Sequence, residues 1–164
     1  MSRWDEPHRG WHGRGHLGTL LQNIEEATGL SESDCEVLRY AALFHDVIYD
    51  PLSATNEEDS AQLAATALMN YDRREEVFRI ILATKSHQSK EELAQRFNAW
   101  DCAILHDTSW EKLQQYEQGI AFEYRVVPPD IYRRERSRFL RSAAMEYGNP
   151  LLDRLADEVN LVQS

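Results

Sequence analysis

Hydrophobic residues recur along the chain mainly at intervals of three and four positions, a spacing that places them on one face of an α-helix. Two stripes show this spacing best: Leu17, Leu20, Leu21 and Ile24, and Val77, Ile80, Ile81 and Thr84. No segment of four or more residues alternates strictly between apolar and polar positions between turn signals, which is the pattern of a half-buried strand. The sequence therefore predicts an all-α fold without a β-sheet.

Capping residues, prolines and glycines divide the chain into helix-length pieces. Ser33, with Glu36 three residues later, predicts an N-cap for a helix that carries the apolar run 37–48. Tyr49, Asp50 and Pro51 should end that helix. The acids that follow Asn56 suit the positive end of another helix. Further helices are expected over residues 90–100, 110–126, 130–147 and 151–162.

The chain has 164 residues, about the length of one domain, and a chain of this size buries enough surface to form a single core. We therefore expect one helical bundle over residues 1–164. Its 18 basic and 28 acidic residues give a net charge of −10, which repels phosphate backbones and argues against general nucleic-acid binding. A small anionic substrate held by a metal ion is compatible with this charge.

Membrane insertion and export are not expected. No apolar run approaches the ~20 residues that span a bilayer, and the first residues lack the apolar run of a secretory signal. Cys35 and Cys102 lie in helical patterns without CxxC spacing, so we expect both to be reduced and structural. The expected location is the cytoplasm.

The dipeptide His45-Asp46 lies inside the otherwise apolar stretch 41–49. A carboxylate buried there costs several kcal/mol unless it is paired with a positive group or bound to a cation. Two interpretations follow. Asp46 pairs with an arginine while His45 is an ordinary core residue, or both residues bind a metal ion.

Other residues add to the metal interpretation. His12 and His16 are four positions apart and would share one face of a helix. Asp101 stands between two apolar stretches, where a buried apolar residue would be expected. Two imidazoles and two carboxylates form a mixed nitrogen and oxygen donor set, which suits a borderline or hard divalent ion with open positions. A zinc finger and a site made only of sulfur are excluded.

Five blocks in this order resemble a bacterial group within the HD superfamily of metal-dependent phosphohydrolases. The patterns of that group are PHR-x-YH-x3-H, FHD-x-x-YDP, NEE-x-SA, T-x-x-H and D-x-AIL. The corresponding segments here are 7–16 (PHRGWHGRGH), 44–51 (FHDVIYDP), 56–61 (NEEDSA), 84–87 (TKSH) and 101–105 (DCAIL). The resemblance extends from residue 7 to about residue 124, and it implies an HD-type helical domain.

The resemblance implies that His16, His45, Asp46 and Asp101 bind one divalent metal ion, which could be Mn, Fe, Co, Ni, Zn or Mg. The choice of His16 follows the cyclic-nucleotide phosphodiesterases, whose YH-x3-H opening is similar. In that comparison His12 is the general acid or an orienting donor. The rival assignment has His12 as the metal ligand and His16 outside the coordination shell.

Four more residues are candidates for contact with substrate. His87 could hold a phosphate oxygen from the same helix face as Thr84, or it could simply sit at a helix end. Glu58 could orient water, although ordinary capping of a helix explains it about as well. Arg9 and Lys85 are candidate phosphate clamps, and either could instead be a surface charge.

The function implied by the resemblance is hydrolysis of a phosphate ester, with a nucleotide or a similar small phosphorylated molecule as substrate. The alternative is a non-hydrolytic HD-fold protein that binds a metal or a small ligand for regulation or assembly. A homodimer is left open.

Overall fold

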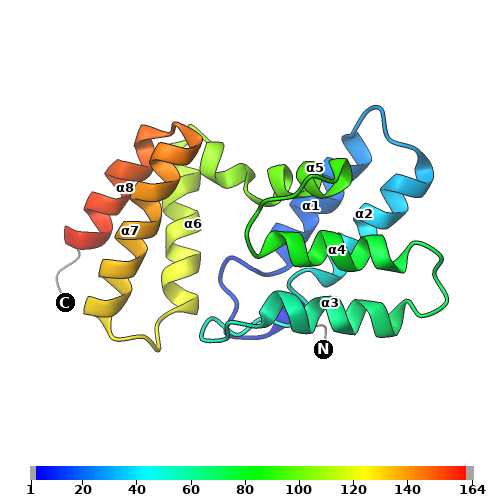
Figure 1. Ribbon diagram of the computed structural model, residues 1–164. Coiled ribbons are helices and arrows are strands. Elements are labelled where there is room, and N and C mark those ends of the chain that lie inside the picture. The colour runs from blue at the N-terminus through cyan, green and yellow to red at the C-terminus, as the bar shows by residue number, and fades with distance from the viewer. Residues whose placement is uncertain (1–2, 162–164) are drawn as a thin grey trace. The chain divides into compact units, whose positions relative to one another are not determined.

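The computed structural model describes residues 3–161, and within this range it contains eight α-helices and no β-strand (Figure 1). The helices are α1 (Arg14–Glu26), α2 (Glu32–Phe44), α3 (Asn56–Ala67), α4 (Arg74–Thr84), α5 (Glu92–Asp101), α6 (Trp110–Glu123), α7 (Pro129–Tyr147) and α8 (Pro150–Leu161). Two short 3-10 turns, η1 (Arg3–Asp5) and η2 (Ala103–His106), complete the structure. The prediction of an all-α fold is confirmed. None of the helices within 3–161 is both long enough and apolar enough to cross a membrane.

The described residues form two compact units. The first contains residues 3–6 and 12–101, and the second contains residues 7–11 and 102–161. Each unit has its own core of buried apolar side chains. The expectation that residues 1–164 form a single domain stays a prediction.

In the first unit, α3 and α4 pack side by side, and α2 packs against both α1 and α4 (Figure 1). The core of this unit contains the two stripes found in the sequence. Their buried members are Leu20, Ile24, Val77, Ile80, Ile81 and Thr84. Helical periodicity therefore identified which faces of α1 and α4 turn inward.

Both ends of α2 differ from the prediction. The N-cap is Ser31, not Ser33, because Ser31 and Asp34 form a reciprocal capping box. The helix ends at Phe44 and does not continue to Ile48. Beyond it, the backbone N–H of Ile48 donates to the hydroxyl of the buried Ser60 at 3.1 Å, and this hydroxyl donates to the Ile48 carbonyl at 3.2 Å. These bonds to α3 replace the helical bonds that Ile48 would otherwise make.

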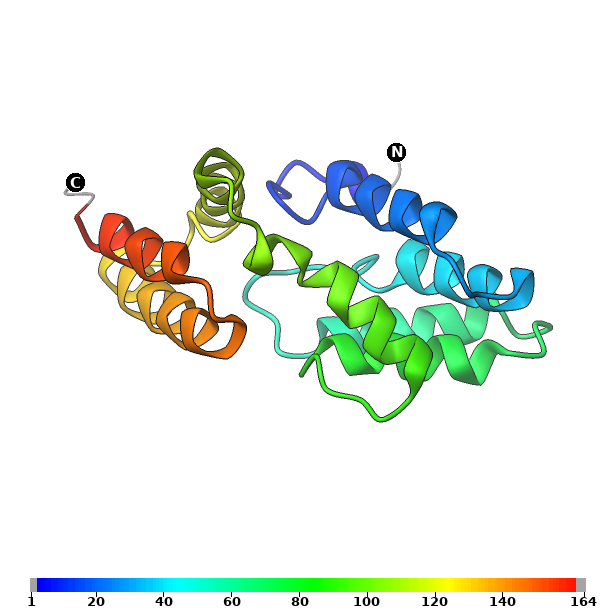
Figure 2. The ribbon, with the colours of Figure 1, turned by 90° about the horizontal axis from the view of Figure 1, so that it is seen from above.

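In the second unit, α7 and α8 run side by side and α6 packs against α8 (Figure 2). Gly148 ends α7 in the left-handed conformation, with φ of +63°. The side chain of Asn149 then donates to the carbonyls of Leu105 and Asp107, at 2.9 and 3.0 Å. These bonds attach the connection between the two helices to the segment that begins with η2.

The segment 7–11 is held to α6 by Glu123, whose side chain is almost completely buried. The backbone N–H groups of Gly10 and Trp11 both donate to its Oε1 at 2.8 Å. Gly10 lies so close to the backbone of Gly119 on α6 that a Cβ atom on Gly10 would overlap the Gly119 carbonyl oxygen. The position therefore requires glycine because of a close backbone approach.

Replacing Gly10 with alanine should lower the melting temperature, because the methyl group must displace backbone and typically costs about 1–3 kcal/mol. Gly18→Ala is the matched control, since Gly18 is an exposed position of α1 where an added Cβ meets no atom within 4 Å. That change should raise stability by about 0.5–1 kcal/mol. Thermal unfolding followed by circular dichroism measures both. An unchanged melting temperature in Gly10→Ala would contradict the close approach to Gly119.

Candidate metal centre

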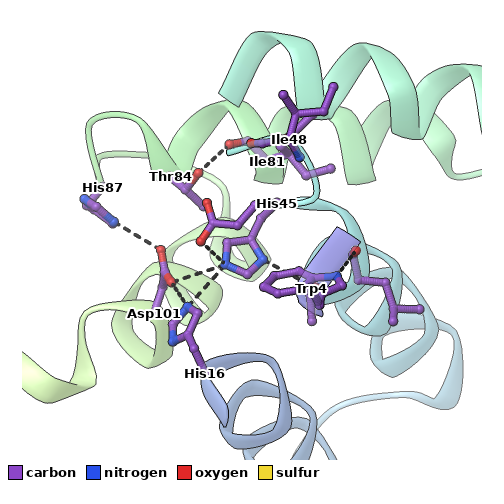
Figure 3. Close-up of polar contacts among 12 residues, drawn as sticks. Trp4, His16, His45, Ile48, Ile81, Thr84, His87 and Asp101 are labelled. Atoms are coloured by element: carbon purple, nitrogen blue, oxygen red, sulfur yellow. Dashed lines mark hydrogen bonds and ion pairs between the residues drawn. The ribbon is translucent and has the colours of Figure 1, made fainter. Parts of the chain in front are cut away.

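Three residues from three helices of the first unit converge at one buried point (Figure 3). His16 comes from the first turns of α1, His45 is the C-cap of α2, and Asp101 is the last residue of α5. His16 Nε2 lies 2.9 Å from Asp101 Oδ1 and 3.3 Å from His45 Nε2. His45 Nε2 is 3.6 Å from the same Asp101 oxygen.

The helices place these side chains by their own periodicity. His16 shares the buried face of α1 with Leu20 and Ile24, four and eight positions later. Asp101 follows the buried Phe97 by four positions on α5. His45 is 1% exposed, and its Nδ1 lies 3.0 Å from the Ala42 carbonyl oxygen. A proton on Nδ1 can donate to this carbonyl, which leaves Nε2 as the ring atom that faces the cluster.

Buried carboxylates dominate the electrostatics of the cluster. Burial alone would lower the pKa of His45, but Asp46, whose Oδ2 lies 3.2 Å from His45 Nε2, and Asp101 outweigh it. The result raises the pKa of His45 to about 9. Burial would raise the pKa of both acids, yet their imidazole neighbours hold the pKa of each below its usual range. Both acids therefore stay ionised, and protonated His45 supplies a positive charge beside them in the metal-free protein.

A bound metal cation could take the place of the proton on His45. The ligand atoms of His16, His45 and Asp101 all lie within 4.8 Å of one another, so these three residues could hold a metal ion. Two imidazole nitrogens and a carboxylate oxygen fit a borderline divalent ion, and three protein ligands leave coordination positions open. The hydrogen bond of His45 Nδ1 to a backbone carbonyl is the usual support of a histidine ligand.

Asp46 lies beside this group rather than within it. Its carboxylate approaches the His45 nitrogen that faces the cluster, and it follows the end of α2, so its backbone is no longer helical. Its role as a fourth ligand stays a prediction.

The prediction that His12 and His16 share one helix face is wrong, because α1 begins at Arg14 with Gly13 as N-cap and His12 lies before it. The turn before α1 still brings the two rings near each other, with 6.0 Å between their centroids. The His12 ring also packs on Tyr49 at 4.6 Å. The structure thus places His12 next to the cluster, while the ring that joins His45 and Asp101 is that of His16. The assignment of His12 as a proton donor stays a prediction.

His87 lies beyond α4 and not on its face, because the helix ends at Thr84. The residue has φ of +52°, in the left-handed region that few non-glycine residues adopt. Its Nε2 lies 3.2 Å from Asp101 Oδ2, the carboxylate oxygen that is not directed at His16 (Figure 3). His87 is therefore adjacent to the cluster, and its side chain is 38% exposed. Its contact with a phosphate oxygen stays a prediction.

Lys85 and Glu58 bind to each other. The Lys85 ammonium donates to the Glu58 carboxylate and, at 2.7 Å, to the carbonyl of Ala54. This contact ties the start of α3 to the end of α4, so both charges have a structural role. Arg9 belongs to the second unit. Contact of these three residues with a substrate stays a prediction.

Two neighbours of the His45 ring were not identified from the sequence. Phe97 lies 5.5 Å away with the ring planes at 74°, and the helical period could have indicated it because Phe97 precedes Asp101 by one turn. Trp4 also lies 5.5 Å away, at 43°, but it comes from the 3-10 turn η1 and the sequence carries no signal of this contact.

Comparison with models of protein families, with curated proteins and with solved structures gives no match. The interpretation of the cluster therefore depends on its own geometry.

Alanine at His16, His45 or Asp101 should abolish stoichiometric metal binding, because each change removes one of three converging ligand atoms. Asp46→Ala should do the same if Asp46 completes the set. His106→Ala in the second unit is the control, and it should keep a full equivalent of metal. Elemental analysis of the purified variants measures this. Full metal content in all of the first three variants would mean that the cluster is not a metal centre.

Proposed function

We propose that this chain is a metal-dependent phosphohydrolase that hydrolyses a phosphate ester, with a nucleotide or a similar small phosphorylated molecule as substrate. A single divalent ion would be held by His16, His45 and Asp101, with Asp46 as a further ligand. The observation that carries the proposal is the convergence of two imidazole nitrogens and a carboxylate oxygen at one buried point. The resemblance of five motifs to the HD superfamily supports it.

The donor set and its surroundings suit this reaction. When bound, a divalent ion would neutralise charge on a phosphoryl oxygen and lower the pKa of a water molecule that acts as nucleophile. The protein supplies a ligand set that is largely closed to solvent, since His16 and His45 are buried and Asp101 is nearly so. A cation held with little water around it acts more strongly on a substrate than one in bulk water.

His12 is the proposed proton donor to the departing oxygen. Its ring lies next to His16 but outside the group of three that could hold the ion. Packing against Tyr49 restricts the orientation of the imidazole, which a positioned acid requires.

His87 is the proposed contact for a phosphate oxygen. Its ring touches Asp101 and is partly exposed, so it can reach the cluster and the solvent at the same time. Lys85 could bind a phosphate only in competition with Glu58.

The test is a panel of phosphate esters that includes nitrophenyl, alkyl and nucleotide esters, each assayed with Mn²⁺, Co²⁺, Mg²⁺ or Zn²⁺. At least one ester should be hydrolysed in a manner that a chelator abolishes and added metal restores. His45→Ala should be inactive with every metal, which controls for contaminating phosphatases. Stoichiometric metal without hydrolysis of any ester would favour the alternative, a metal-dependent regulatory protein.

His12→Ala should keep its metal but lose about 10²–10⁴-fold in the rate of hydrolysis of alkyl or nucleotide esters, the usual contribution of a positioned acid. The loss should be much smaller for a nitrophenyl ester, because its departing oxygen needs little protonation. Steady-state kinetics on the two ester types, with metal content measured in parallel, gives the comparison. If His12→Ala loses its metal, His12 is a ligand rather than the acid.

A further inference from the structure

The proposed histidine ligands lie at helix ends, which are the least stable parts of helices. His16 is the third residue of α1, and Gly13, the N-cap of that helix, provides no side-chain hydrogen bond. His45 is the C-cap of α2. Terminal turns fray because their backbone groups lack partners within the helix. Contacts from outside α1 and α2 are therefore needed to stabilise these two helix ends and fix the positions of the His16 and His45 imidazoles.

The 3-10 turn η1 contacts the end of α2 through Trp4. The indole is 6% exposed, and its ring lies 5.5 Å from the His45 ring at 43° (Figure 3). Its Nε1 donates to the carbonyl of Leu43 at 3.2 Å, in the last turn of α2. One side chain therefore packs on the imidazole and satisfies a backbone group of the turn that carries it.

The next residue of η1 contacts the start of α1. Asp5 accepts two hydrogen bonds from the guanidinium of Arg14, from Nε to Oδ1 and from Nη2 to Oδ2, the second at 2.6 Å. Arg14 is the first residue of α1 and precedes His16 by two positions. A carboxylate at this end also suits the positive end of the helix dipole.

We propose that η1 is a clasp, in which Trp4 and Asp5 hold the ends of α2 and α1 so that His45 and His16 stay aligned for the metal ion. Trp4 is a positioning residue that acts through His45, and Asp5 acts through Arg14. The inference depends on the proposed metal centre. Because coupling between two equilibria is reciprocal, bound metal also holds the clasp closed.

Titration with Co²⁺, followed by its absorption bands, tests the clasp on the full chain. Trp4→Leu should weaken Co²⁺ binding roughly tenfold, the lower end of the effect of residues that support metal ligands. Trp110→Leu is the control, because Trp110 lies in the second unit and packs under Arg154. It should leave the affinity unchanged, although it also removes a tryptophan.

Two milder variants keep the test decisive if Trp4→Leu does not fold. Trp4→Phe retains an aromatic ring and loses the bond to Leu43, and Asp5→Ala removes an exposed ion pair that no folded core needs. Each should weaken Co²⁺ binding by about twofold to fivefold, because Trp4→Phe removes one hydrogen bond and Asp5→Ala removes one exposed ion pair. Glu25→Ala, which removes one exposed partner of Arg39 in the same unit, should have no effect.

The outcomes separate the clasp from the metal centre. A wild-type protein that binds no metal overturns the proposed centre and the clasp together. Tight binding by the wild type, with equal affinity in a folded Trp4→Leu protein, overturns only the clasp. If Trp4→Leu is unfolded, unchanged affinity in both Trp4→Phe and Asp5→Ala overturns it. Weaker binding in either of these variants, with the controls unchanged, supports it.

Discussion

The first unit buries two ionised carboxylates in largely apolar surroundings, and its structure must place positive groups beside them. Asp46 and Asp101 cannot be left there without a positive neighbour, and the residues that the structure places around Asp101 are three imidazoles. Histidine satisfies this need in two ways, as a cation when protonated and as a ligand when neutral. His45 can therefore stabilise the two carboxylates in the metal-free protein and can also bind a divalent ion, with the ion taking the place of a proton.

Sequence periodicity identified the helices and their inward faces because these depend on local spacing. The predicted helix ends were less accurate, because one tertiary contact there can outweigh the helix propensity of the local sequence. α2 stops at Phe44 because the backbone of Ile48 bonds to Ser60 on the next helix. The N-cap was misplaced by two residues because Ser31 and Ser33 both have an acid three positions later. In the structure Ser31 forms the box with Asp34, while the Ser33 hydroxyl accepts from Arg73.

The candidate site shows the same division between local and long-range information. His45 and Asp101 could be named from their residue types in apolar surroundings, whereas His16 was chosen over His12 by the resemblance of its motif. The structure brings the three together. The position of His12 before the helix could not be read from a spacing of four, since that spacing assumes that the helix has already begun. The contact of Trp4 with His45 joins residues far apart in the chain, and no local pattern encodes it.

The hydrogen bonds from Gly10 and Trp11 to Glu123 affect the order in which parts of the chain fold during synthesis. The bonded residues are 113 and 112 positions apart in the chain. Such distant contacts close late, because a long loop must first be ordered. The helices of residues 14–101 need only their own neighbours, so they can form while the ribosome is still making α6. The segment 7–11 is made before α6, but its backbone finds its acceptor only after the whole of α6 has been made, because Glu123 is the last residue of that helix.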